Sequence, residues 1–277
     1  MTEPAKQGAF IAKLYAAARK NNSLVCVGLD PELDKVPAHL SDLPQPVFEF
    51  NRHIIDATAE FACCFKPQFA HYAAQGMEDQ LLATIRYIHE RHPGLPVILD
   101  SKRGDIGSTA ARYAQESFGR YGADAVTVNP YLGFDSVEPY LKWNDRGVII
   151  LCRTSNPGAR DFQDLQADGK RLYRHVAERV ARDWNGNGNC MLVIGATYPE
   201  ELAEIRSAVG TLPFLVPGVG AQGGDVAAAV KAGRTPDGLG MVLNSSRGIL
   251  YAGSGEGFAD AARTATRTLR DEINRYR

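Results

Sequence analysis

The sequence predicts an α/β fold, a (β/α)8 or TIM barrel in a single domain over residues 1–277. Two observations favour this fold. Short apolar runs alternate with helical segments along the whole chain, and about eight strand–helix units fit into this length. Most of the runs are continuously apolar, which is typical of strands covered on both faces in a parallel sheet. An open doubly wound sheet is the alternative arrangement of the same elements.

The strands are expected where an apolar run ends in polar or turn-forming residues. Each of these runs is short enough for a strand and is followed by a longer segment with helical periodicity. The expected strands cover residues 25–30, 62–68, 96–102, 125–130, 147–153, 190–197, 213–220 and 240–246.

Helical periodicity fills the segments between these runs. Residues 1–20 are expected to form a helix that precedes the first strand and caps the floor of the barrel. Residues 185–189 read Asn-Gly-Asn-Gly-Asn and are expected to form a polar loop before the sixth strand. Two apolar stripes have helical spacing. One comprises Leu172, Val176, Val180 and Trp184, and the other Phe258, Ala261, Ala262, Ala265, Leu269 and Ile273.

Composition excludes several classes of protein. Hydrophobic residues make up 44% and charged residues 23% of the chain, which excludes a disordered protein, a collagen and a coiled coil. Lys and Arg together number 31 and Asp and Glu 32, so the formal net charge is −1. This balance argues against a protein that mainly binds nucleic acid or an anionic membrane.

Cysteine usage favours a cytoplasmic location. The five cysteines are scattered without a C-x-x-C spacing, which argues against a disulfide framework and a zinc ribbon. The first residues lack the apolar core of a signal peptide, and no apolar run approaches the roughly 20 residues of a membrane span. The six histidines show no metal-binding spacing, so no metal site is expected.

Polar side chains gather at the carboxyl ends of the expected strands, and the strand starts carry almost none. In a barrel these ends meet at one rim, where the chemistry takes place. The candidate residues are Asp30, Lys66, Asp100, Lys102, Asn129, residues 153–156, Gln222 and Arg247. No role can be assigned to Asn129 or to Arg103.

The end of the third expected strand carries the central motif. Asp100 and Lys102 are two residues apart, so on a regular strand they face the same way. Asp105 lies in the turn before the next helix, which it could cap, and Thr109 would lie on the first turn of that helix. An ion pair with a helix cap is the ordinary interpretation of such a motif. The chemical interpretation is a lysine kept protonated by nearby carboxylates and available as a general acid.

A phosphate site is indicated after the seventh and eighth expected strands. A glycine-rich loop, with Gly218, Gly220, Gly223 and Gly224, precedes a helix near Asp225, and it could direct backbone N–H groups at an anion. Taken alone, the loop is more simply a strand-to-helix turn. Arg247, at the end of the next strand, adds a guanidinium that can bind phosphate with two hydrogen bonds.

The pattern Asp100-x-Lys102-x-x-Asp105-Ile106-x-x-Thr109 resembles the signature of the orotidine 5′-phosphate decarboxylase family. The fuller string DSKRGDIGSTAARYA resembles the subgroup of that family found in many bacteria. The resemblance extends from residues 27–31, Val-Gly-Leu-Asp-Pro, to residues 244–248, Asn-Ser-Ser-Arg-Gly. It is specific because several separate motifs occur in the family's order at the expected strand ends.

The resemblance implies decarboxylation of orotidine 5′-monophosphate to uridine 5′-monophosphate and CO2, the last step of pyrimidine nucleotide synthesis, without a metal or an organic cofactor. It implies that Lys102 protonates C6 within a charge network with Asp100 and Asp105. It also implies a homodimer with shared active sites, in which Asp105 and Thr109 serve the neighbouring subunit. The implied substrate-binding residues are Asp30, Lys66, Ile106, Thr109, Ser155, Gln222 and Arg247, with Gly220, Gly223 and Gly224 in the phosphate loop.

Two alternatives remain at this point. Related barrels, the 3-keto-L-gulonate 6-phosphate decarboxylases and hexulose phosphate synthases, share D-x-K-x-x-D but use magnesium. The other alternative is a non-catalytic barrel that binds a nucleotide.

The chain also departs from the family's pattern in two loops. Residues 220–225 are a short segment for a lid, and residues 156–166 are a long one. We expect the longer segment to share in covering the site.

Overall fold

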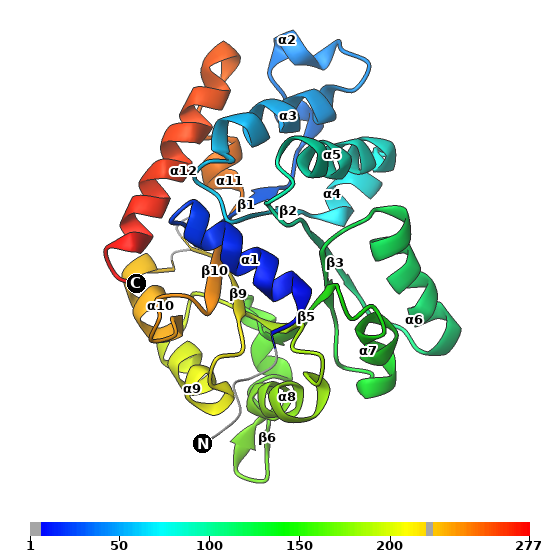
Figure 1. Ribbon diagram of the computed structural model, residues 1–277, viewed down its shortest axis with the longest axis vertical. Coiled ribbons are helices and arrows are strands. Elements are labelled where there is room, and N and C mark those ends of the chain that lie inside the picture. The colour runs from blue at the N-terminus through cyan, green and yellow to red at the C-terminus, as the bar shows by residue number, and fades with distance from the viewer. Residues whose placement is uncertain (1–6, 220–223) are drawn as a thin grey trace.

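The structure, a computed structural model, describes residues 7–219 and 224–277. Eight parallel strands form one sheet in the order β2-β1-β10-β9-β8-β5-β4-β3. Parallel bridges from Phe65 to Val97 and from Gln68 to Asp100 join the two outer strands, so the sheet closes on itself. The helices surround these strands (Figure 1). The fold is therefore the (β/α)8 barrel that the sequence predicts.

Each barrel strand falls on an expected run, and only β3 continues one residue further. Nearly every strand residue is buried, which accounts for the continuous apolar runs. Two further strands form a separate antiparallel hairpin after β5: β6 (Gln166–Ala167) and β7 (Lys170–Arg171). The barrel strands are β1 (Val25–Leu29), β2 (Cys64–Pro67), β3 (Ile98–Arg103), β4 (Ala125–Val128), β5 (Gly147–Arg153), β8 (Cys190–Ile194), β9 (Phe214–Pro217) and β10 (Met241–Ser245).

The outer layer consists of α-helices with several short 3₁₀ and π-helical turns. None of the helices in the described ranges is long and apolar enough to cross a membrane. The α-helices are α1 (Ala9–Lys20), α2 (Ala38–Ser41), α3 (Pro46–Thr58), α4 (Phe69–Ala73), α5 (Glu78–Arg91), α6 (Gly107–Ala114), α7 (Phe134–Leu141), α8 (Leu172–Arg179), α9 (Pro199–Val209), α10 (Val226–Gly233), α11 (Arg247–Leu250) and α12 (Phe258–Asn274).

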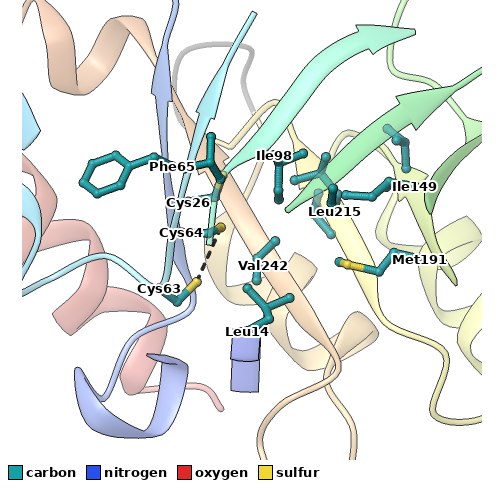
Figure 2. Packing of buried hydrophobic residues seen from close by; sticks show 14 of the residues in the cluster. Leu14, Cys26, Cys63, Cys64, Phe65, Ile98, Ile149, Met191, Leu215 and Val242 are labelled. Atoms are coloured by element: carbon teal, nitrogen blue, oxygen red, sulfur yellow. Dashed lines mark hydrogen bonds between the residues drawn. The ribbon is translucent and has the colours of Figure 1, made fainter. Parts of the chain in front are cut away.

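Helix α1 covers the end of the barrel at which the strands begin (Figure 1). Its Leu14 is fully buried and lies beside Val242 at the lower end of the core (Figure 2). Gly147, the first residue of β5, leaves room for the Phe10 ring, which an added Cβ would overlap. Lys13 donates to Asp124 at 2.7 Å, just before β4. The floor is therefore closed, and the carboxyl ends of the strands remain open for ligands.

The stripe expected on α12 packs against the barrel, with Phe258, Ala262 and Ile273 almost fully buried. The stripe expected over residues 172–184 is confirmed at Val180, which is fully buried, but within α8 it is displaced by one residue. Tyr173 and Ala177 are the most buried side chains of α8, whereas Leu172 and Val176 are only partly buried. The Tyr173 ring packs against the buried guanidinium of Arg153, and the Tyr173 hydroxyl donates a hydrogen bond to Glu204 of α9. These contacts turn the Tyr173 face of α8 towards the barrel.

Candidate active site

The carboxyl ends of five strands surround a cavity of about 220 Å³. Its position at the rim of the barrel follows from parallel strands that all end on the same side. The expected residues Asp30, Lys66, Asp100 and Arg247 all line it. The complete lining is Asp30, Glu32, Lys66, Gln68, His71, Asp100, Pro217, Gly218, Val219, Asn244, Ser245, Ser246 and Arg247.

Asp100 is the centre of a charged network at the bottom of this cavity. Its Oδ2 accepts a hydrogen bond from Lys66 Nζ at 2.8 Å, and its Oδ1 accepts one from Lys102 Nζ at 2.7 Å. The hydroxyl of Thr127 lies 2.8 Å from the same Oδ1. The Lys66 side chain is 4% exposed, whereas that of Lys102 is 43% exposed. One buried carboxylate is thus shared by a buried cation and a cation that reaches solvent.

Burial by itself favours the neutral forms of these groups, and the opposite charges reverse that preference. Burial raises the pKa of Asp100, but Lys66 and Lys102 outweigh it and hold the pKa well below its ordinary value of 3.8. Burial lowers the pKa of Lys66, but Asp100 and Asp30 outweigh it and raise the pKa above its ordinary value of 10.5. Both groups are therefore charged at neutral pH.

Strand β3 is not regular at the motif. Leu99 pairs with Val126 and Arg103 with Val128, so the three residues 100–102 face Thr127 alone. Lys102 has φ +47°, in the left-handed region that side chains other than glycine rarely adopt. The expectation that Asp100 and Lys102 face the same way on a regular strand is wrong in its geometry. Their ammonium–carboxylate contact forms through the bulge instead.

Asp105 does not cap the following helix, contrary to the expectation. Its Oδ1 accepts from the N–H of Ile106 at 2.8 Å, and α6 begins only at Gly107, because the chain is still extended at Ile106. In the described part of the chain no ion pair joins Asp105 to Lys102. Ile106 is 54% exposed and Thr109 is also exposed. Of the residues in this motif, Asp100 therefore lines the cavity, whereas Ile106 and Thr109 lie on the surface.

Asp30 and Arg247 both line the cavity. Within the described residues, Oδ1 of Asp30 is buried without a hydrogen-bond partner, so it is an unsatisfied acceptor. Arg247 is exposed at the first position of α11, directly after β10. Arg247 can therefore contact an anionic ligand that enters from solvent.

The glycine-rich loop is described only in part. Gly224 pairs with Val219 by a parallel bridge, and a Cβ at Gly224 would lie 2.7 Å from the carbonyl oxygen of Gly218. Asp225 caps α10 by accepting from the N–H of Ala228 at 3.1 Å, as a helix start at that point requires. The predicted residues Gly220, Gln222 and Gly223 lie outside the described residues.

Ser155 is partly buried and does not line the cavity described above. It lies against Gly195 at the end of β8, where an added Cβ would come within 2.8 Å of the Ser155 Cβ. The neighbouring Thr154 is tied to Gln163, whose Oε1 accepts from its N–H at 2.8 Å. Residues 157–161 form a 3₁₀ turn, so the long segment after β5 is folded back on itself.

Arg153 is a structural residue, although its place at a strand end suggested a site. It is 2% exposed and its Nε donates to Glu201 at 2.6 Å. Its guanidinium lies between the rings of Tyr173 and Tyr198, with distances of 5.4 and 5.5 Å to the ring centroids. Arg153 therefore holds α8 and α9 against β5.

The structure also gives roles to two residues that the sequence left unassigned. Arg103 binds Glu116 at 2.9 Å and stacks on the Phe69 and Tyr113 rings, which joins the end of β3 to the neighbouring helices. Asn129 makes a turn, since its Oδ1 accepts from the N–H of Tyr131 at 3.0 Å. Both residues support the rim from outside the cavity.

Several residues in or near the cavity were not predicted as site residues, among them Thr127, Asn244 and His71. Thr127 contacts Asp100, Asn244 lines the cavity beside Ser246, and His71 lines it from α4. Asn244 was detectable, because an amide at the end of an apolar strand is unusual. Thr127 was not, since threonine is common in strands and its partner is 27 residues away.

Lys66 and Arg247 line the cavity together with the carboxylates of Asp30, Glu32 and Asp100. Lys102 is not among the lining residues, but its ammonium contacts Asp100. The site can bind an anionic ligand, place negative charge against Asp100 and deliver a proton from an ammonium group. Within residues 7–219 and 224–277, no group of three or more His, Cys, Asp or Glu side chains is arranged to hold a metal ion.

Comparison with known proteins gives one family. Residues 23–262 match the model of the orotidine 5′-phosphate decarboxylase / HUMPS family. An orotidine 5′-phosphate decarboxylase of Aromatoleum aromaticum is 60% identical over 97% of this chain and 99% of that protein. One of Janthinobacterium sp. is 59% identical over 96% of this chain and 98% of its own length.

Solved structures agree with this result. The OMP decarboxylase of Leishmania donovani superposes with a TM-score of 0.85 at 38% identity, over 97% of this chain and 98% of that one. The UMP synthase of the same organism gives 0.87 at 40% identity, over 98% of this chain and 57% of that one. The similarity therefore spans nearly the whole chain in sequence and in fold.

Proposed function

Since the chain belongs to the orotidine 5′-phosphate decarboxylase / HUMPS family, we propose that it decarboxylates orotidine 5′-monophosphate to uridine 5′-monophosphate and CO2. The observation that carries the proposal is the placement of Lys102 Nζ 2.7 Å from the buried carboxylate of Asp100, at the rim of the barrel. A cation and an anion fixed side by side suit a reaction in which a carboxylate leaves and a carbanion is protonated.

The proposed chemistry uses both charges. Asp100 repels the substrate carboxylate, and this repulsion is relieved as the bond from C6 to the carboxyl carbon breaks and CO2 leaves. The electron pair stays on C6, where the Lys102 ammonium stabilises it. A proton then passes from Nζ to C6, which forms the product C–H bond and leaves the lysine neutral until solvent reprotonates it. The partial exposure of Lys102 supports this last step.

The remaining groups bind the substrate away from the reacting carbon. The unsatisfied Oδ1 of Asp30 suits a ribose hydroxyl donor, and the charge of Asp30 also acts on Lys66. Arg247 and the loop ending at Gly224 suit the phosphate. From the family pattern, Ser155 binds the pyrimidine. Gln222 lies over the ligand on the same pattern, with Gly220 and Gly223 in the phosphate loop.

Binding energy from the phosphate is used at the pyrimidine. The uncatalysed reaction is very slow, so the site must lower the barrier by roughly 20 kcal/mol. Interactions with a remote phosphate can offset the cost of holding the substrate carboxylate close to Asp100.

We propose that the reaction needs no metal or organic cofactor, and the measurement with EDTA described below tests the metal requirement. A cytoplasmic location is also proposed, in keeping with five free, buried cysteines.

The first test follows the loss of orotidine monophosphate absorbance with and without EDTA, for the wild type, Lys102→Ala and Lys142→Ala. Lys142 is an exposed lysine paired with Glu138 and is the matched control. We expect EDTA-insensitive turnover that Lys102→Ala lowers by at least about 1,000-fold and Lys142→Ala leaves unchanged. Activity on sugar phosphates that EDTA removes would instead indicate the magnesium-dependent relatives. Binding of uridine monophosphate without turnover would leave a nucleotide-binding barrel.

We also propose that the protein is a homodimer with shared active sites. Ile106 and Thr109 are exposed and Asp105 is partly buried, and Asp105 makes no ion pair with Lys102 in the described chain. A second copy would place its Asp105 near Lys102 and its Ile106 and Thr109 against the substrate. The active unit would then be a dimer with two composite sites.

Subunit mixing tests the shared site directly. Lys102→Ala and Asp105→Ala should each be inactive as homodimers. After exchange of subunits, half of the dimers are mixed and each has one intact site, so about a quarter of the wild-type activity should return. Mixing Lys102→Ala with Lys102→Met is the control and should stay inactive. Sites confined to one chain would give no recovery in either mixture.

A further inference from the structure

The hydroxyl group of Thr127 occupies the centre of the bulge in β3. Its Oγ1 lies 2.8 Å from Oδ1 of Asp100 and 3.0 Å from the backbone nitrogens of Ser101 and Lys102. Thr127 is 1% exposed and is not among the residues that line the cavity. It therefore contacts both partners of the proposed catalytic pair without reaching the ligand itself.

These three contacts determine where the hydroxyl proton points. A hydroxyl group has one hydrogen and two lone pairs, and a backbone N–H can only donate. The N–H groups of Ser101 and Lys102 therefore take the lone pairs, and the single hydrogen of Thr127 is donated to Asp100. This arrangement requires Oδ1 of Asp100 to be an acceptor, as in the ionised carboxylate.

The same contacts explain how the bulge is maintained. Residues 100–102 of β3 face only Thr127, so the N–H groups of Ser101 and Lys102 lack carbonyl partners on β4 at this point. The Thr127 hydroxyl replaces those partners while Lys102 keeps its left-handed backbone. A valine in its place would fill the same space, but it would leave two partly buried donors unpaired and remove a hydrogen bond from Asp100.

We propose that Thr127 is a positioning residue for decarboxylation, whose hydroxyl fixes the Asp100 carboxylate and the Lys102 backbone so that the lysine ammonium is directed at the reacting carbon. This inference rests on the proposed function, which it deepens. Because the residue acts through Asp100 and Lys102, its loss should slow the chemical step and leave ligand binding largely intact.

The test compares Thr127→Val, which removes the hydroxyl, with Thr127→Ser, which keeps it. Thr266→Val is the matched control, since Thr266 is also fully buried and donates to the Ala262 carbonyl oxygen at 2.7 Å, in α12. We expect Thr127→Val to lower kcat by about 100-fold, with KM and the Kd of uridine monophosphate changed by less than about threefold. Thr127→Ser should recover most of kcat, and Thr266→Val should leave it unchanged.

Thr127→Cys, with a thiol as a weaker partner, is the second variant if the valine variant does not fold, and its kcat should lie between those of the serine and valine variants. An active wild type whose Thr127→Val variant keeps full kcat would overturn the inference alone. The inference would also be overturned if Thr127→Ser were as slow as Thr127→Val, or if Thr127→Val changed KM and the Kd of uridine monophosphate instead of kcat. A wild type without orotidine monophosphate turnover would overturn the proposed function as well.

Discussion

The ammonium nitrogen of Lys66 lies 2.8 Å from Oδ2 of Asp100, and neither side chain is more than 9% exposed. The other oxygen of the same carboxylate binds Lys102, whose side chain is 43% exposed. The two lysines therefore have different environments around one anion. The buried one fixes the carboxylate, and the exposed one has the access to solvent that the proposed proton transfer from Lys102 requires.

Replacing Lys66 with methionine should lower the stability of the protein. The variant leaves a buried carboxylate with one cation fewer, and removal of one partner of a buried pair costs about 3 kcal/mol or more. Urea unfolding measures the difference. Lys142→Met is the control, because its pair with Glu138 is exposed and should contribute less than about 1 kcal/mol. Equal losses in the two variants would contradict the importance of burial.

The same pair predicts a pH dependence of stability with opposite signs at the two ends of the range. The pKa of Asp100 is held well below 3.8 in the folded protein, so its contribution is present above that pH and is lost as the pH falls below it. The pKa of Lys66 is raised above 10.5, so its contribution is present below that pH and is lost as the pH rises further.

We therefore expect the difference in unfolding free energy between the wild type and Lys66→Met to be constant from about pH 5 to about pH 10 and to shrink on either side. Urea titrations of both proteins across this range measure it. If this difference in unfolding free energy stayed constant at the acid and alkaline ends, the titration of Asp100 and Lys66 would not be the cause of the pH dependence.

Removal of the Arg247 side chain should weaken the binding of a nucleotide through its phosphate and leave the affinity for the nucleoside unchanged. Charge-assisted hydrogen bonds from an arginine contribute about 1.5–3 kcal/mol, so Arg247→Ala should raise the Kd of uridine monophosphate by roughly 10- to 100-fold. The affinity for uridine, which has no phosphate, should be unchanged. Calorimetry with both ligands measures the two effects, and an equal loss for both would place Arg247 elsewhere on the ligand.

Arg153 should prove important for folding rather than for binding. Arg153→Met leaves the buried Glu201 with the exposed Arg171 as its one remaining ion-pair partner in the described part of the chain, and it should cost about 3 kcal/mol of stability. Adding Glu201→Leu should recover part of that loss, because the uncompensated charge is removed. Urea unfolding of the single and double variants tests this. If the Arg153→Met protein were fully stable but no longer bound uridine monophosphate, Arg153 would have a role in ligand binding and not in folding.

Much of the fold could be predicted because its signals are local. Each barrel strand coincides with an apolar run bounded by polar residues, from Val25–Leu29 to Met241–Ser245. The rim of the site was predictable for a related reason. Parallel strands in a closed barrel end on one side, so Asp30, Lys66 and Asp100 had to approach one another once the barrel was inferred.

Other features could not be predicted because they depend on partners far away in the sequence. Arg153 has the polar strand-end position of a site residue, but Glu201 lies on α9, and only the packing of that helix makes the guanidinium structural. Asp105 has the residue type of a helix cap, yet the helix begins beyond its reach. Residue type and position suggest a role, and the neighbours decide it.

The sequence by itself determined the alternation of strands and helices and the strand ends at which the charged residues gather, because hydrophobic periodicity is set along the chain. It favoured the barrel over an open sheet, and its resemblance to a known family identified the acidic–basic motif. Only the tertiary structure decided that β3 bulges at the motif, that Lys102 takes a left-handed backbone and that Thr127 supports both. Such contacts form only when barrel closure brings β3 and β4 into one register, and hydrogen bonds are sensitive to distances of a few tenths of an ångström.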